Sequence, residues 1–138
     1  MKLLILLCLV ASTYAIGTTQ SAGVRGKLIC NGSPAAGVTV RLYDHDRGPD
    51  ADDLMASGKS KENGEFEISG HEDEILTIDP KLNIYHDCDD GKKPCQRKFS
   101  IMIPDSYVSK GKVPREIFDA GVIQLAGLFP GESRECVS

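Results

Sequence analysis

The chain has 138 residues, of which 41% are hydrophobic and only 6% aromatic, and it contains no tryptophan. Its 16 Lys and Arg residues stand against 20 Asp and Glu residues, which gives a net charge of −4. A chain of this size forms one domain with a modest core. The acidic balance argues against nucleic acid as a partner, because phosphate backbones require a basic protein face.

Residues 1–15 have the layout of a secretory signal peptide. One positive charge at Lys2 precedes an apolar run over 3–11, and small residues follow up to Ala15. This run is shorter than the about 20 residues needed to span a bilayer, and no later segment is apolar enough to be a transmembrane segment. The sequence therefore predicts cleavage after Ala15 and a secreted, extracellular domain over 16–138.

Four cysteines remain after the predicted cleavage, and their even number in an oxidising compartment predicts two disulfides. They are Cys30, Cys88, Cys95 and Cys136. A zinc site is the alternative, but no two of them have the C-x-x-C spacing. Three disulfide pairings are possible. We favour Cys88 with Cys95, because the segment between them resembles a turn, and this leaves Cys30 with Cys136.

Alternation of apolar and polar residues predicts a series of short strands. In chain order they are expected at 24–30, 38–43, 54–59, 66–68, 82–88, 98–103 and 121–125. About seven or eight short strands with almost no helix predict an all-β fold, an antiparallel β-sandwich.

Four segments between these strands carry weaker signals. Residues 16–22 are small and polar, and we expect a mobile N-terminal tail. Asn63-Gly64 is typical of a tight hairpin turn. We expect 71–74 to form an acidic connection, and 105–118 to have at best weak helical character.

Several short motifs, in this order, resemble the nematode transthyretin-like family. They are Gly26-x-Leu28-x-Cys30-x-Gly32-x-Pro34, Val38-x-Val40-x-Leu42-x-Asp44, Asn63-Gly64-x-Phe66, Pro80-x-Leu82-x-Ile84-x-His86-x-Cys88 and Asp119-x-Gly121. The resemblance covers nearly the whole predicted mature chain. It implies a prealbumin-like sandwich, secretion, and neither enzymatic chemistry nor a cofactor. It also implies two possible functions: bridging phosphatidylserine on dying cells to a cell-surface receptor, or carrying a small lipophilic ligand.

The sequence does not favour an enzyme. The related hydroxyisourate hydrolases end in a Tyr-Arg-Gly-Ser motif, which is missing from residues 132–138 of this chain. The three histidines, His45, His71 and His86, are scattered, and a base without a partner nucleophile or oxyanion donor indicates no particular reaction. We expect His86 to be a structural residue that pins a strand end beside a disulfide.

The basic residues fall into two groups. The first surrounds the segment between two cysteines and comprises Lys92, Lys93, Arg97 and Lys98. The second comprises Lys110, Lys112 and Arg115. A cation near an anionic membrane contributes about 1 kcal/mol, so the first group is our candidate contact for an anionic lipid headgroup. Ordinary solubilising charge is the alternative.

Two further features concern ion binding and modification. The acidic segment from Asp44 to Asp53 offers carboxylates, which calcium prefers, but it lacks the spacing of an EF-hand loop. We therefore expect a solvated acidic loop and no metal. Asn31-Gly32-Ser33 is a glycosylation sequon in an exposed turn, and Pro34 directly after it is expected to lower its use.

Overall fold

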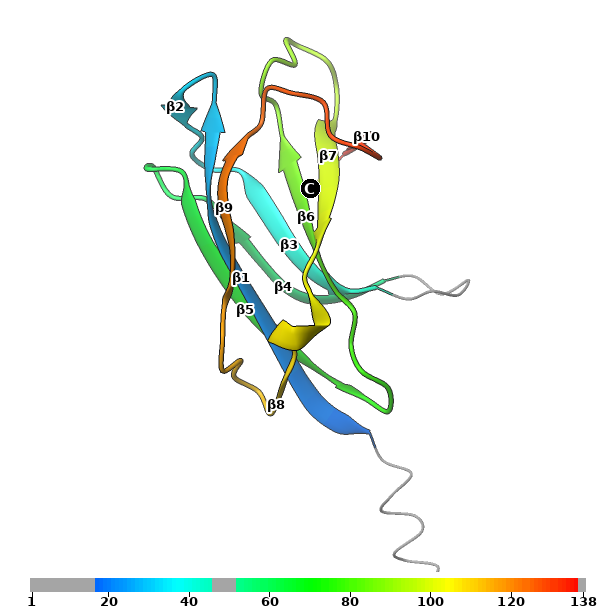
Figure 1. The fold of residues 1–138 in the computed structure, drawn as a ribbon. Helices are drawn as coiled ribbons and strands as arrows, with labels where there is room; N and C mark the ends of the chain where they lie inside the picture. Colours follow the sequence, from blue (N-terminus) through cyan, green and yellow to red (C-terminus); the bar gives the residue numbers. More distant parts are fainter. Residues whose placement is uncertain (1–16, 46–51, 137–138) are drawn as a thin grey trace, which may run out of the picture.

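The computed structural model describes residues 17–45 and 52–136. The predicted leader, residues 1–15, lies outside this range. The described strands form two five-stranded sheets, which pack face to face as a β-sandwich (Figure 1). The all-β sandwich predicted from the alternation is therefore confirmed.

The first sheet is built around one long strand, β1. Its members are β1 (Thr18–Cys30), β2 (Ser33–Pro34), β5 (Glu65–Glu74), β8 (Ser109–Lys110) and β9 (Phe118–Gln124). Strand β5 pairs with β1 antiparallel, while β9 runs parallel to β1 on its other side. This parallel pair is the one departure from the expected antiparallel arrangement among the described strand pairs.

The second sheet has the strand order β10-β7-β6-β3-β4, and all of its pairs are antiparallel. Its members are β3 (Thr39–Asp44), β4 (Asp53–Lys59), β6 (Pro80–His86), β7 (Gln96–Met102) and β10 (Ser133–Glu135). Three of the ten described strands, β2, β8 and β10, have only two or three residues. The seven longer strands agree with the predicted number.

The core lies between the two sheets and consists of alternate residues from their facing sides. Val40 and Leu42 of β3, with Leu82 and Ile84 of β6, are 0% exposed. Leu28 of β1 meets them from the other sheet within the same buried cluster. Each such side chain contributes about 1.5–3 kcal/mol through burial. These are the residues whose period of two predicted the strands.

Two segments without an apolar pattern also belong to strands. Residues 18–22, predicted as a mobile tail, form the start of β1, and residues 71–74, predicted as a connection, form the end of β5. The two segments pair with each other, with Gln20 opposite Glu72. Backbone hydrogen bonds therefore fix these polar residues in the sheet, although their side chains give no alternating signal.

Turn chemistry explains the remaining differences. Asn63-Gly64 does form a tight turn, in which the Gly64 N–H donates to the Lys61 carbonyl at 2.9 Å. Gly64 has φ +85°, which favours glycine. The prediction of a hairpin is wrong, however, because β4 and β5 lie in different sheets.

The segment 105–118 contains one 3-10 turn, η1 (Asp105–Tyr107), before the short strand β8.

Candidate functional site

The two disulfides meet at one end of the sandwich, where β6 leads into β7. Cys30, at the end of β1, is bonded to Cys88, and Cys95 is bonded to Cys136. The predicted pairing of Cys88 with Cys95 is wrong. Cys88 faces the first sheet, at a Cα–Cα distance of 5.8 Å from Cys30. Cys95 precedes Gln96, which pairs with Glu135, and this register brings Cys95 beside Cys136.

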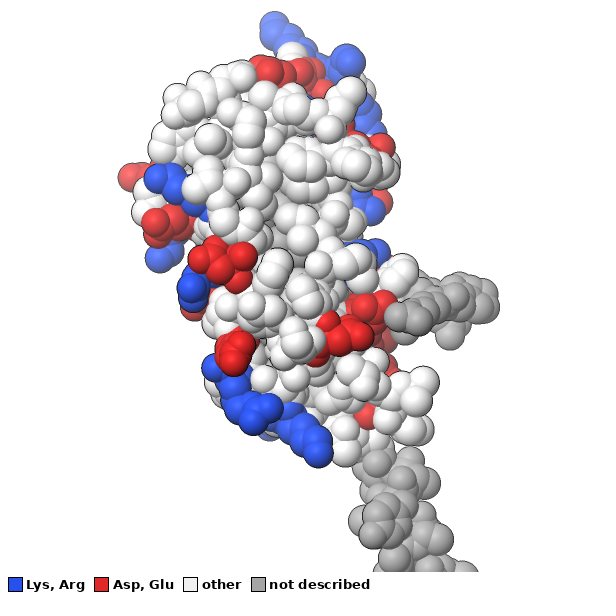
Figure 2. Space-filling model, viewed as in Figure 1, with Lys and Arg blue, Asp and Glu red and all other residues white. Residues whose placement is uncertain are grey.

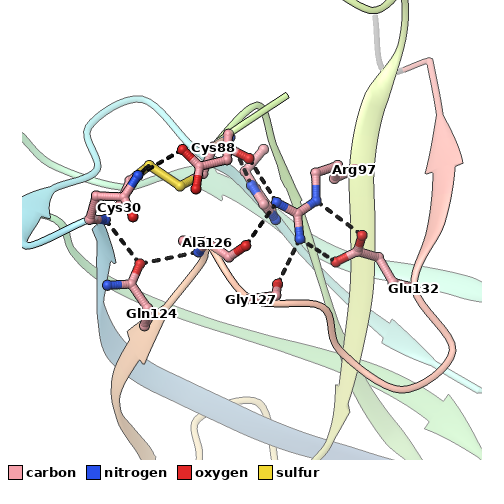
Figure 3. Close-up of a disulfide and its surroundings, with 10 residues drawn as sticks. Cys30, Cys88, Arg97, Gln124, Ala126, Gly127 and Glu132 are labelled. Carbon is pink, nitrogen blue, oxygen red and sulfur yellow. Dashed lines mark hydrogen bonds and ion pairs between the residues drawn. A yellow bond between two sulfur atoms is a disulfide. The ribbon is translucent and has the colours of Figure 1, made fainter. Parts of the chain in front are cut away.

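Arg97 lies inside this end of the molecule and is only 5% exposed. Its Nε and Nη2 donate to the two carboxylate oxygens of Glu132 at 3.0 and 2.8 Å (Figure 3). Nη1 and Nη2 also donate to the carbonyls of Cys88 and Gly127, each at 2.7 Å. The guanidinium therefore joins the end of β6 to the C-terminal segment.

The electrostatics of this pair agree with its geometry. The hydrogen bond with Glu132 raises the pKa of Arg97, and the same hydrogen bond lowers the pKa of the Glu132 carboxyl. Removing one partner of such a buried pair costs about 3–5 kcal/mol, because the other charge stays buried. Arg97 is thus a structural residue, and its assignment as a lipid contact is wrong.

Lys98 also makes an ion pair with the C-terminal segment. We call the end of β6, β7, β10 and the two disulfides that link them to the rest of the chain the frame. The Lys98 ammonium lies 3.4 Å from a carboxylate oxygen of Glu135, and its side chain is 18% exposed. A second arginine, Arg134, donates from Nη1 to Asp90 at 2.8 Å and lowers the pKa of that carboxyl. Glu132 and Arg134 were not predictable from the sequence as parts of this site, because their partners lie more than thirty residues away. Their only local signal is the charged run that precedes Cys136.

Lys92 and Lys93 differ from their basic neighbours. Both are exposed in the β6–β7 connection, which projects from the disulfide-linked end (Figure 1). None of the ion pairs between described residues involves either lysine.

The acidic residues of the same connection are held by other partners. They are Asp87, Asp89 and Asp90, which accept hydrogen bonds from Gln96, Asn31 and Arg134 respectively. Of these, only Asp90 is buried, against Arg134, whereas Asp87 and Asp89 stay exposed, so the exposed part of the connection carries both acidic groups and the ammonium groups of Lys92 and Lys93.

The second basic group lies at the other end of the sandwich. Lys110, Lys112 and Arg115 are exposed in and after β8, which pairs with Gln20 and Ser21 of β1. Ten residues of β1 separate Gln20 from Cys30, or about 33 Å along a strand. Figure 2 shows basic side chains at the two opposite ends of the molecule, with uncharged residues and several acidic and basic side chains between them. One flat surface therefore meets only one of the two groups.

His86 is a buried structural residue, as expected. It is 2% exposed, and its Nδ1 accepts a hydrogen bond from the backbone N–H of Cys88 at 3.1 Å. Burial, with a smaller contribution from the charge of Arg97, lowers the pKa of its imidazole. The hydrogen bond fixes the end of β6 directly beside the Cys30–Cys88 disulfide.

Asn31 lies in the exposed two-residue turn between β1 and β2. Its side-chain nitrogen, the atom that a glycan would modify, donates to Asp89 Oδ1 at 2.7 Å. The glycosylation of this sequon stays a prediction.

Carboxylates gather near the end of the sandwich opposite the disulfides. Oxygens of Asp44, Asp53, Glu72 and Glu74 all lie within 4.8 Å of one another. Burial, followed by a hydrogen bond with Asp44 and the charge of Asp53, raises the pKa of Glu72 to about 8. The expectation of a solvated loop is wrong for Asp44, which is 4% exposed. Residues 46–51 of that loop lie outside the described residues.

Similarity to known proteins agrees with the motifs and the fold. A profile of the transthyretin-like family matches residues 25–104. The chain belongs to the transthyretin-like family. It is 78% identical to transthyretin-like protein 5 of Caenorhabditis elegans, over 99% of each chain. Transthyretin-like proteins 33 and 2 of the same organism are 51% and 49% identical, over 97% and 98% of this chain and 92% and 95% of theirs. The resemblance to this family is thus confirmed.

None of the helices described for this family member is long and apolar enough to cross a membrane.

Proposed function

We propose that this member of the transthyretin-like family is a secreted, non-enzymatic binding module that docks on anionic cell surfaces. The proposed contact is the β6–β7 connection, with phosphatidylserine as the first candidate headgroup. A cell-surface receptor is the second proposed partner, so that the protein acts as an extracellular bridging factor. The observation that supports this proposal is the exposure of Lys92 and Lys93, which no ion pair between described residues engages, in a connection whose Asp90 is bonded to Arg134.

The rigidity of the frame favours such a contact. The connection, residues 87–95, contains Cys88 of the Cys30–Cys88 disulfide near its start and ends at Cys95, which is bonded to Cys136. Lys92 and Lys93 are thus presented by a connection that is anchored at both ends, which reduces the conformational entropy lost on binding. Two cations near an anionic membrane contribute about 2 kcal/mol, so we propose weak and reversible docking.

The carrier of a small lipophilic ligand is the alternative function, and the structure offers it less support. A hollow of about 520 Å³ lies over β1, β5 and β9, but three cations and three acids line it. Such a lining does not suit a lipophilic molecule, whose binding sites are lined mainly by apolar side chains.

Vesicle sedimentation tests the proposed function. We expect the oxidised, mature protein to sediment with vesicles that contain phosphatidylserine and not with pure phosphatidylcholine vesicles, and we expect higher salt to weaken binding. The variant K92Q/K93Q should bind about 30-fold more weakly, which corresponds to the loss of about 2 kcal/mol. Equal binding to both vesicle types would exclude recognition of anionic lipid. Co-purification of a hydrophobic compound, detected by native mass spectrometry, would favour the carrier.

A further inference from the structure

A polar hollow of about 420 Å³ lies on the outer face of the second sheet, over β3 and β4. Its lining includes Thr39, Arg41, Ser57 and Lys59, with Gly37 and Gln96 also present. None of these residues belongs to the β6–β7 connection, although Gln96 donates a hydrogen bond to Asp87 of that connection.

The strand register arranges the four central residues as a square. Thr39 lies opposite Lys59, and Arg41 lies opposite Ser57. Directly opposed side chains of an antiparallel pair have Cβ atoms about 4.5–5.5 Å apart, and diagonal ones about 7–8 Å apart. Cations and hydroxyl groups therefore alternate around the square, and all four side chains share one face of the sheet.

Arg41 is held in position by Tyr85, which lies on the same face of the sheet. Its guanidinium carbon is 5.5 Å from the centroid of the Tyr85 ring, a cation–π contact. The Tyr85 hydroxyl accepts a hydrogen bond from Asn83 at 3.2 Å. Asn83 in turn accepts one from Ser100 at 2.7 Å. This chain of contacts across three strands orients the guanidinium before any ligand arrives.

One donor of Arg41 is not used by the protein. Its Nε is buried and has no hydrogen-bond partner among the described residues. Because Nε is closed off from the surface, a ligand in the hollow would accept hydrogen bonds from the terminal guanidinium nitrogens instead.

No ion pair between described residues compensates the charge of the hollow, a property that it shares with Lys92 and Lys93 but not with Lys98 and Arg25. No acid lines it, and none of the ion pairs between described residues involves Arg41 or Lys59. On the same face, the ammonium group of Lys98 pairs with Glu135. In the hollow over β1, β5 and β9, Arg25 lies 3.5 Å from Asp119.

We propose that the hollow on β3 and β4 binds a phosphate group, carried either by a soluble phosphate ester or by a lipid headgroup. The Arg41 guanidinium presents a planar set of donors that matches two phosphate oxygens. Lys59 contributes a second charge from the diagonal position, and the hydroxyls of Thr39 and Ser57 donate from the other two corners. The volume exceeds that of one phosphate and leaves room for the rest of a small polar molecule.

Titration of the mature, ¹⁵N-labelled protein with inorganic phosphate tests this site by NMR. We expect saturable shifts at the amides of Thr39, Ser57 and Gly58, and no such shifts with sodium chloride at equal ionic strength. R41Q and K59Q should each weaken phosphate binding at least about tenfold, since one charge-assisted interaction contributes about 1.5–3 kcal/mol. The matched control K61Q, an exposed lysine outside the hollow, should leave the affinity unchanged.

Vesicles distinguish the two sources of the phosphate. Weaker binding of K59Q to phosphatidylserine vesicles, with Lys92 and Lys93 intact, would assign the site to a headgroup, and unchanged vesicle binding would assign it to a soluble phosphate ester. Should R41Q destabilise the fold, K59Q at its exposed position tests the site alone. Equal phosphate affinity in wild type, K59Q and K61Q, or shifts spread over all lysines, would overturn the proposal.

Discussion

Two groups of acids at opposite ends of the sandwich are held in different ways. At the disulfide-linked end, Arg97 faces Glu132 and Arg134 faces Asp90, so that each charge meets one of opposite sign. At the opposite end, Glu72 lies among other carboxylates. Paired charges stabilise a frame, whereas grouped like charges are tolerated only if protons are shared or bound more tightly. The β6–β7 connection is therefore supported by paired charges at the disulfide-linked end.

The substitution R97M is the strongest way to break this comparison. It leaves the Glu132 carboxylate buried without its partner, and we expect the free energy of unfolding to fall by about 3–5 kcal/mol. Urea unfolding measures this loss. The double variant R97M/E132L removes both charges and should lose less than R97M alone.

A matched control for R97M lies four residues away. Lys93 is exposed, and K93M should change the free energy of unfolding by no more than about 0.5 kcal/mol. A comparable loss in K93M and R97M would contradict the division between frame and exposed connection.

The substitution E72Q sharpens the comparison from the other end. The pKa of Glu72 is raised to about 8 in the folded protein, above its ordinary value of 4.5, so the folded state binds a proton more tightly than the unfolded state. Stability should therefore fall as pH rises from about 4.5 to 8. Glutamine keeps the shape and removes this effect.

We expect E72Q to unfold at a higher temperature than wild type at pH 8, by about 4 °C, the shift that 1 kcal/mol gives in a domain of this size. The two proteins should converge near pH 4.5. Thermal unfolding monitored by circular dichroism across this range measures the difference, and a constant offset at every pH would exclude the titration of Glu72 as its cause.

The sequence predicted the fold well where side chains alternate. Val38, Val40 and Leu42 are buried as expected, and the strand that ends near Cys88 is present. Polar pairing was not predictable in the same way. The segment 18–22 joins the sheet through backbone hydrogen bonds to β5. Such hydrogen bonds do not depend on side-chain hydropathy, so the apolar pattern could not predict them.

The candidate site was predicted only in part for a related reason. Lys92 and Lys93 are exposed as expected, but Arg97 belongs to a strand, where neighbouring residues face opposite sides. Its inward position depends on Glu132, a residue that only the folded chain brings near. The disulfide pairing likewise depends on the register of β7 with β10, which no local turn signal reports.

The most direct test of the proposed docking compares two double charge reversals that change the net charge equally. K92E/K93E alters the β6–β7 connection, and K110E/K112E alters the basic group at the opposite end. In sedimentation with phosphatidylserine vesicles, we predict that K92E/K93E abolishes binding while K110E/K112E binds as wild type does. Equal loss in both variants, or loss in K110E/K112E alone, would contradict docking through the disulfide-linked end.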